Sequence, residues 1–247
     1  FSSGFFVYYF TAFIALYYKF QHNYKARTWL FCFFSLYFFY KASGAFVLLV
    51  VASAIVDFFL GNLIYQVPSK PTKKVLLIIG IIFNLGILTA FKYTNFFIEI
   101  VNAFLQQKIS PLHILLPAGI SFYTFESISY MVDVYRRKIL PARRFADYLL
   151  FLSFFPKLVM GPIVRASDFL PQISKPYFVS KEQFSSGFFL IVTGLFKKLI
   201  ITDYISANLV NFVFDDPSKY TGIECLTAMY GFAVVIYCDF SGYSSIA

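Results

Sequence analysis

Two acidic residues lie in a stretch of this sequence that is otherwise apolar and aromatic. Residues 113–137 contain a Pro-Ala-Gly break, then Glu126 and Asp133, and end in a basic run that starts at Arg136. A carboxylate at membrane depth costs several kcal/mol, so it faces a protein interior or a wet cavity. Helical periodicity brings Glu126, Tyr130, Asp133 and Arg136 close together on one face. The two acids predict either a structural cluster, neutralised by Arg136 or another cation, or one wall of a polar pore.

Other polar residues are placed in the same unusual way between apolar runs. Lys92 follows one run, and residues 155–165 are a Pro- and Gly-containing segment whose irregular backbone requires surrounding protein or water. Asp239 comes directly after the last run, beside a glycine that permits a close turn. Each has a plain alternative: Lys92 could snorkel to an interface, residues 155–165 could form a helix-capping turn at the membrane surface, and Asp239 could belong to a structural polar cluster. We predict that seven side chains border a shared polar passage: Lys92, Glu126, Asp133, Lys157, Arg165, Asp239 and Tyr243.

The composition is typical of an integral membrane protein. Of 247 residues, 59% are hydrophobic and only 13% are charged, and the mean hydropathy is +0.71. The net charge of +9 comes from cations in short loops between apolar runs. Such cations indicate loops on the cytoplasmic side of a membrane rather than nucleic-acid binding. The predicted fold is an all-α, polytopic transmembrane helical bundle with re-entrant or broken helices.

The apolar runs outline the elements of this bundle. Residues 148–160 are too short to cross a hydrocarbon core of roughly 30 Å at about 1.5 Å per residue, so they are predicted to be re-entrant or tilted. Asp57 lies inside a run and is expected to make a helix–helix hydrogen bond near Asn62. Residues 168–182 are expected to form a polar interfacial connection. The predicted spans are residues 5–18, 29–40, 45–65, 75–90 continued after a break by 96–105, 184–201 and 227–240.

Motifs of soluble-enzyme chemistry are missing from this sequence. The three cysteines lie in apolar surroundings without metal-ligand spacing, so no metal site is expected. The two histidines are His22 in a basic loop and His113 at the start of the acidic stretch. We assign no catalytic residue within this chain.

Four motifs follow one another along the chain: Ile120-Ser121-Phe122-Tyr123 through Asp133-Val134-Tyr135-Arg136, Phe155-Pro156 with Gly161-Pro162-Ile163, Gly194-Leu195-Phe196-Lys197-Lys198 with Asp203, and Tyr237 with Asp239-Phe240-Ser241-Gly242-Tyr243-Ser244. Together they resemble the membrane-bound O-acyltransferase (MBOAT) family, most of all its members in bacterial alginate O-acetylation. Ser245 stands where relatives usually have Asp. The resemblance covers the whole chain and roughly the first half of a family member, so residues 1–247 are expected to form a single transmembrane domain, truncated at the C-terminus.

The resemblance implies an O-acyltransferase, an acetyltransferase, in the inner membrane of a bacterium. An acyl group from a cytoplasmic thioester donor, acetyl-CoA or an acyl carrier protein, would pass through a tunnel to hydroxyls of an exported polysaccharide. No bound cofactor is implied, and an extracytoplasmic acetyltransferase is the expected partner. The family's histidine, its presumed general base, is expected beyond Ala247, so these residues alone are expected to be inactive. Two alternatives stay open: transfer of D-alanyl groups to teichoic acid, and a transporter or flippase without chemistry.

Overall fold

A computed structural model describes residues 4–105, 109–158, 161–175 and 179–246. The described residues are mainly helical and contain no strand, which confirms the all-α prediction. Four helical stretches are long and apolar enough to cross a membrane: Tyr24–Gln66, Lys70–Leu105, Lys181–Asp215 and Gly222–Ile246. The protein is therefore a membrane protein.

The chain divides into two compact units. The first contains residues 1–159 and 163–176, and the second contains residues 160–162 and 177–247. Each unit is described by itself below. The single-domain organisation expected from the sequence stays a prediction.

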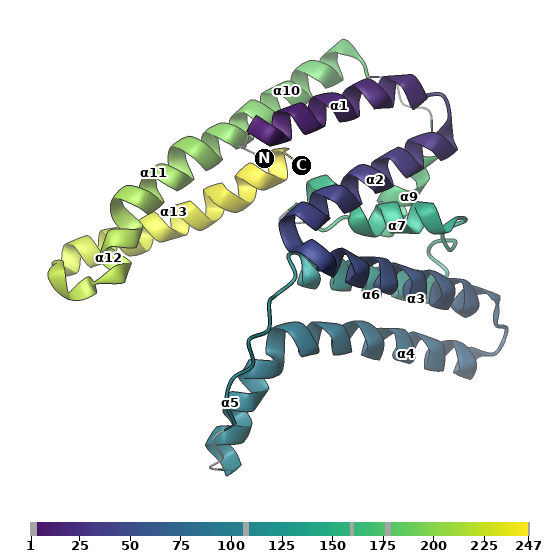
Figure 1. Cartoon of the computed structure of the whole chain (residues 1–247), viewed down its shortest axis with the longest axis horizontal. Coiled ribbons are helices and arrows are strands. Elements are labelled where there is room, and N and C mark those ends of the chain that lie inside the picture. The colour runs from purple at the N-terminus through teal and green to yellow at the C-terminus, as the bar shows by residue number, and fades with distance from the viewer. Residues whose placement is uncertain (1–3, 106–108, 159–160, 176–178, 247) are drawn as a thin grey trace. The chain divides into compact units, whose positions relative to one another are not determined.

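The first unit is a bundle in which two central helices, α6 and α7, are covered by longer ones (Figure 1). Helix α6 packs against α3 and α4, and α7 packs against α2 and α3. The aromatic face of α6 is fully buried at Tyr123 and Tyr130, and glycines permit the close approach: a Cβ on Gly61 would lie 2.8 Å from the Tyr130 ring. The helices are α1 (Gly4–Phe20), α2 (Tyr24–Ser43), α3 (Val47–Gln66), α4 (Lys70–Leu88), α5 (Thr94–Leu105), α6 (Ile120–Tyr135), α7 (Phe145–Ser153), α8 (Phe155–Leu158) and α9 (Ala166–Ile173).

Two breaks in the first unit fall where the sequence has glycine or proline. Gly119 has a left-handed φ of 71° and lies against the backbone carbonyl of Leu158, so a side chain there would clash as well as strain the backbone. The predicted re-entrant segment is two short buried helices, α7 and α8, separated at Phe154. Of the predicted interfacial connection, residues 168–182, the structure places the beginning on α9 and the end on α10, and residues 176–178 lie outside the described residues. Its position at the membrane interface stays a prediction.

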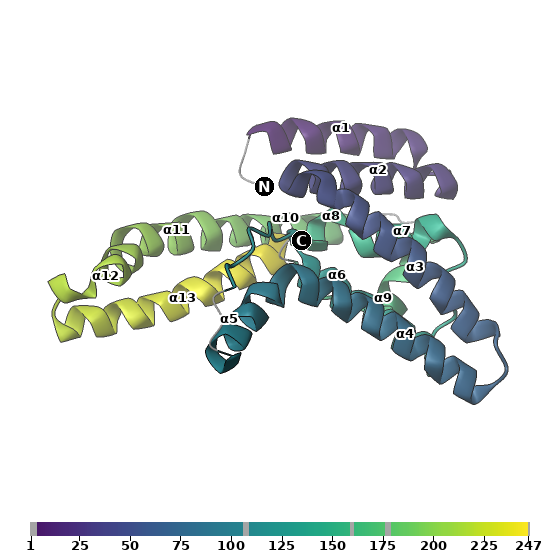
Figure 2. The same cartoon turned by 60° about the horizontal axis from the view of Figure 1, so that its bottom comes forward.

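The second unit is a helical hairpin, which both Figure 1 and Figure 2 show. Its first arm is continuous from α10 to α12 because wide π-helical turns, η3 and η4, join the α-helical pieces without breaking the rod. Gly194 and Gly242 face each other, and a Cβ on Gly242 would lie 3.0 Å from the Gly194 carbonyl oxygen. The elements are α10 (Lys181–Leu195), η3 (Phe196–Thr202), α11 (Asp203–Ile205), η4 (Ser206–Val210), α12 (Asn211–Asp215), η5 (Pro217–Lys219) and α13 (Gly222–Ile246).

Two predicted boundaries in the second unit are wrong. The span predicted to end at Ile201 continues to Asp215, because the charges around position 200 are paired with one another and do not end the helix. The predicted turn at Gly242 is absent, since α13 continues to Ile246. The lack of a side chain at Gly242 instead permits close helix packing.

Candidate functional site

The centre of the candidate site is a buried ion pair between α6 and α8. Lys157 Nζ lies 2.6 Å from Glu126 Oε2, and the two side chains are only 3% and 4% exposed. The Lys157 ammonium also lies over the Phe151 ring, 4.1 Å from its centroid. Both charges are therefore withdrawn from solvent, and each is neutralised by the other.

The same carboxylate also binds the chain after the Pro/Gly segment. Glu126 Oε1 accepts a hydrogen bond from the backbone N–H of Val164 at 3.3 Å. One side chain thus holds two points, Lys157 and Val164, on either side of an irregular segment. We call this arrangement of Glu126, Lys157 and Val164 the carboxylate clamp.

The clamp settles which cation neutralises Glu126. The partner is Lys157, whereas Arg136, the cation named from the sequence, is exposed at the end of α6. The neighbouring Arg137 instead donates to the Tyr65 carbonyl at 3.0 Å. Sequence periodicity could not find Lys157, because it lies on a separate helix.

Lys92 is connected to the first turn of α6. Its ammonium donates to Ser121 Oγ at 3.3 Å and lies 5.5 Å from the centroid of the Tyr93 ring. Lys92 is exposed, and it lies within the wide π-helical turn η2 (Thr89–Tyr93). Helix α6 therefore contacts two lysines, Lys92 through Ser121 and Lys157 through Glu126.

Two predicted site residues of the first unit are not brought into the clamp. Asp133 is half-buried and Arg165 is exposed. Within the described ranges, neither side chain has a hydrogen-bonding or ionic partner. The expectation that both border a polar passage stays a prediction.

A second buried network in the first unit was only partly anticipated. Asp57 Oδ1 accepts from Asn84 Nδ2 at 2.7 Å, and its Oδ2 lies 3.4 Å from Tyr148 Oη, which is 3.3 Å from Ser127 Oγ. All four side chains are at most 1% exposed. The predicted helix–helix hydrogen bond of Asp57 is confirmed, but its partner is Asn84 on α4. Asn62, named from the sequence, donates instead to the Phe58 carbonyl one turn earlier.

The second unit has its own charged cluster, centred on Lys198. The ammonium lies 3.1 Å from Asp203 Oδ1, 2.7 Å from Asp239 Oδ1 and 5.5 Å from the centroid of the Tyr243 ring. In an α-helix, residues five apart are about 140° apart around the axis, so Lys198 and Asp203 would diverge. The π-helical turn η3 brings them together. We call Lys198, Asp203, Asp239 and Tyr243 the lysine cluster.

The sequence named two members of the lysine cluster as wall residues and missed Lys198 in that role. Lys198 and Asp203 both belong to one of the family-like motifs, and this shared motif was the sequence feature that could have indicated their role. A neighbouring lysine, Lys197, donates to Ser241 Oγ at 2.8 Å. Five of the seven predicted residues thus fall into two groups: Lys92, Glu126 and Lys157 in the first unit, and Asp239 and Tyr243 in the second.

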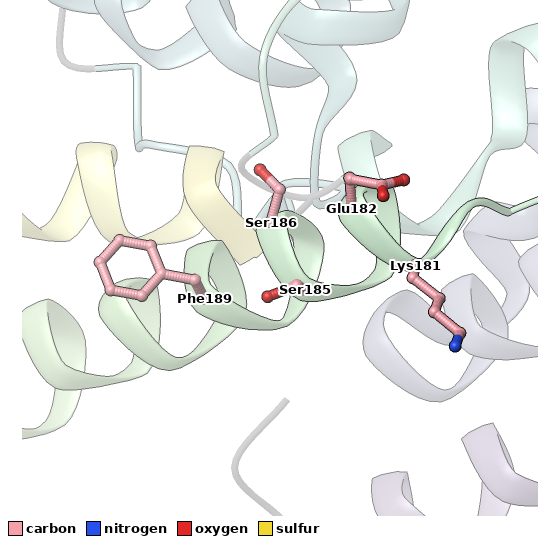
Figure 3. Close-up of a pocket in the computed structure, with 5 residues that line it drawn as sticks. All are labelled: Lys181, Glu182, Ser185, Ser186 and Phe189. Atoms are coloured by element: carbon pink, nitrogen blue, oxygen red, sulfur yellow. The ribbon is translucent and has the colours of Figure 1, made fainter.

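A hollow lies elsewhere, along one helix of the second unit. Figure 3 shows side chains that project from the first turns of α10 and line a hollow of about 640 Å³, wide open to its surroundings. None of the seven predicted residues lines it. The shared polar passage stays a prediction. The lining residues are Lys181, Glu182, Ser185, Ser186 and Phe189.

The geometry favours positioning over proton transfer for the clamp. Glu126 and Lys157 neutralise each other at a site withdrawn from solvent, and the same carboxylate holds the Val164 backbone N–H. Among the described residues, no group of three or more His, Cys, Asp or Glu side chains could hold a metal ion.

The chain is similar to bacterial O-acetylation proteins over most of its length. It is 34% identical over 255 residues to the probable alginate O-acetylase AlgI of Pseudomonas aeruginosa, covering 100% of this chain and 48% of that protein. It is 31% identical over 239 residues to the peptidoglycan O-acetyltransferase of Helicobacter pylori, covering 86% and 45%. The teichoic acid D-alanyltransferase of Bacillus subtilis is 29% identical over 153 residues, covering 58% and 36%.

The chain spans about half the length of these two O-acetylation relatives. No family model matches it. The relatives nevertheless agree in kind, and the family-like motifs lie on the helices that carry the clamp and the lysine cluster. The chain belongs to the membrane-bound O-acyltransferase family.

Proposed function

We propose that the protein is a membrane-bound O-acyltransferase that passes an acetyl group across the membrane to hydroxyls of an exported polysaccharide. The observation that carries the proposal is the 34% identity to an alginate O-acetylase over the whole chain. The donor is an acyl thioester, acetyl-CoA or an acyl carrier protein, and the membrane is the bacterial inner membrane. An extracytoplasmic acetyltransferase completes the transfer, and a histidine outside these residues acts as the base.

The paired charges support a positioning role for this part of the chain. Acyl transfer from a thioester needs a passage in which donor and acceptor meet while bulk water is excluded. The carboxylate clamp ties Lys157 and the backbone of Val164 to α6, and the lysine cluster joins the two arms of the second unit. Charged side chains at membrane depth need such partners.

A second candidate is the transfer of D-alanyl groups from a carrier protein to teichoic acid. It is favoured by the 29% identity to a teichoic acid D-alanyltransferase, although that match covers 58% of the chain. The acetyl proposal is preferred because the O-acetylase matches are closer in identity and cover more of the chain.

Transfer assays on the full-length gene product in sealed vesicles test the proposal. Labelled acetyl-CoA or a labelled D-alanyl carrier protein is enclosed, and alginate, peptidoglycan fragments or teichoic acid is supplied outside with the extracytoplasmic partner. We expect base-labile acetyl ester on a polysaccharide. Transfer of D-alanine alone would favour the second candidate, and release of label without ester formation would indicate a transporter and contradict both.

A further inference from the structure

The apolar run from Lys70 to Leu105 is too long for a single membrane crossing. Its 36 residues would measure roughly 54 Å as a straight helix, against a hydrocarbon core of roughly 30 Å. Helix α4 alone, with 19 residues, measures roughly 28 Å and suffices. Helix α5 is therefore left over after the crossing.

The chain changes direction between α4 and α5 and then returns to its starting point. The π-helical turn η2 separates the two helices, and Figure 1 shows α5 turned away from the axis of α4, with the chain after it running back alongside. Lys92, just before α5, and Ser121, just after the returning chain, are in contact, with Lys92 Nζ 3.3 Å from Ser121 Oγ. Residues 94–116 are thus an excursion whose two ends meet.

Two asparagines on α5 hold the returning chain as a neighbouring β-strand would. Asn95 accepts from the N–H of Leu112 and donates to its carbonyl, both at 2.9 Å. Asn102 does the same to Ile109, at 2.9 and 2.8 Å. Water would satisfy these backbone groups without help, whereas lipid would not, so non-helical chain near lipid needs such partners. We call these two contacts the asparagine clasps.

Helix α5 is amphipathic, with the clasps on its polar face. Asn95, Glu99 and Asn102 share one side, and bulky apolar residues occupy the other. The exposed fraction reaches 83% at Phe104 and 75% at Leu115 on the returning chain. A short helix with one aromatic face and one polar face is typical of an element that lies in the membrane interface. The exposed apolar residues are Phe96, Phe97, Ile100, Phe104, Leu105, Ile109, Leu112, Leu115 and Leu116.

We infer that α5 and the returning residues 109–116 lie in the plane of the membrane interface, with the apolar face of α5 against phospholipid acyl chains. The run from Lys70 to Leu105 then makes one crossing, by α4. This assignment does not depend on which acyl group the protein transfers, because it rests on length, clasps and the exposed apolar face.

Depth measurements on α5 test the inference. The full-length protein carries a single fluorescent label at Phe96→Cys or at Phe104→Cys, in a background with no other reactive cysteine. It is placed in phosphatidylcholine/phosphatidylglycerol vesicles that contain lipids spin-labelled at shallow or deep acyl positions. Ile82→Cys, exposed midway along α4, serves as the deep control, and Lys74→Cys serves as the aqueous control.

An in-plane helix places both α5 labels at the same shallow depth, quenched more by the shallow than by the deep spin label. A membrane-crossing α5 would separate their depths by roughly 12 Å, and that result would overturn the inference. Absence of quenching by either lipid would also overturn it, because the face would then be covered by protein or water.

The clasps are tested separately by hydrogen exchange at the amides of Ile109 and Leu112. Replacing Asn95 and Asn102 together by alanine is expected to raise both exchange rates by at least tenfold, and Glu99→Gln, on the same face, is expected to leave them unchanged. Unchanged rates in the double variant would contradict the role of the clasps.

Discussion

Replacing Lys157 by methionine should destabilise the first unit more than any change to an exposed charge. The substitution keeps the length of the side chain but leaves Glu126 without its cation at a site only 4% exposed. Removing one partner of such a buried pair costs about 3–5 kcal/mol. At roughly 2–4 °C per kcal/mol for a unit of this size, the melting temperature should fall by roughly 6–20 °C.

The measurement uses a buried cysteine of the same unit as the reporter. Cys32 is 1% exposed and its thiol lies 3.3 Å from the Ala146 carbonyl oxygen. With Cys225 and Cys238 replaced by alanine, the reaction of Cys32 with a fluorogenic maleimide in detergent reports unfolding of the first unit during heating. Lys74→Met, an exposed lysine on α4, is the matched control and should melt as the parent does.

A double variant shows whether the charge pair itself is responsible. Glu126→Gln combined with Lys157→Met removes both charges and retains an acceptor for the Val164 N–H, so it should recover most of the lost stability. The reasoning would be refuted if Lys157→Met melted with the parent, or if the double variant melted as low as the single one.

Two further substitutions test other buried contacts. The thiol of Cys32 reports on the first unit and that of the buried Cys238 on the second, each with the other cysteines replaced by alanine. Asp57→Ala leaves one N–H of the buried Asn84 amide without an acceptor, while the other still donates to the Gly80 carbonyl, and should cost about 1–3 kcal/mol; a melting temperature equal to the parent's would contradict this. Gly242→Val would overfill the contact with Gly194 and should cost about 1–3 kcal/mol. The control Gly187→Val has open space around it and should change little, so an equal effect of both valines would exclude the packing explanation.

The sequence was sufficient for the fold class and for the breaks, because these depend on local features. Long apolar runs indicated helices, and the Pro-Ala-Gly sequence indicated the break at Gly119, which adopts a positive φ. The family-like motifs also located the residues that became the clamp and the lysine cluster. These predictions needed no knowledge of which helices are neighbours.

The pairings could not be predicted, because they join helices that are distant in the chain. Tertiary packing places Lys157, on a separate helix, beside Glu126, and it leaves Arg136 exposed just beyond the end of α6. Asp57 likewise pairs with Asn84 on the next helix and not with the nearer Asn62. The misplaced helix end at Ile201 has the same origin, since its charges are neutralised across the hairpin by Asp239.

The wide turn η3 makes the number of residues in its helix part of the ion-pair geometry. Deleting one residue between Lys198 and Asp203 would return this stretch to regular α-helix with the two residues four apart, a spacing at which their side chains still meet. Inserting one residue there would place them six apart, about 120° away from each other around a regular helix axis. An insertion in this stretch should therefore be more harmful than a deletion, even though neither changes a loop.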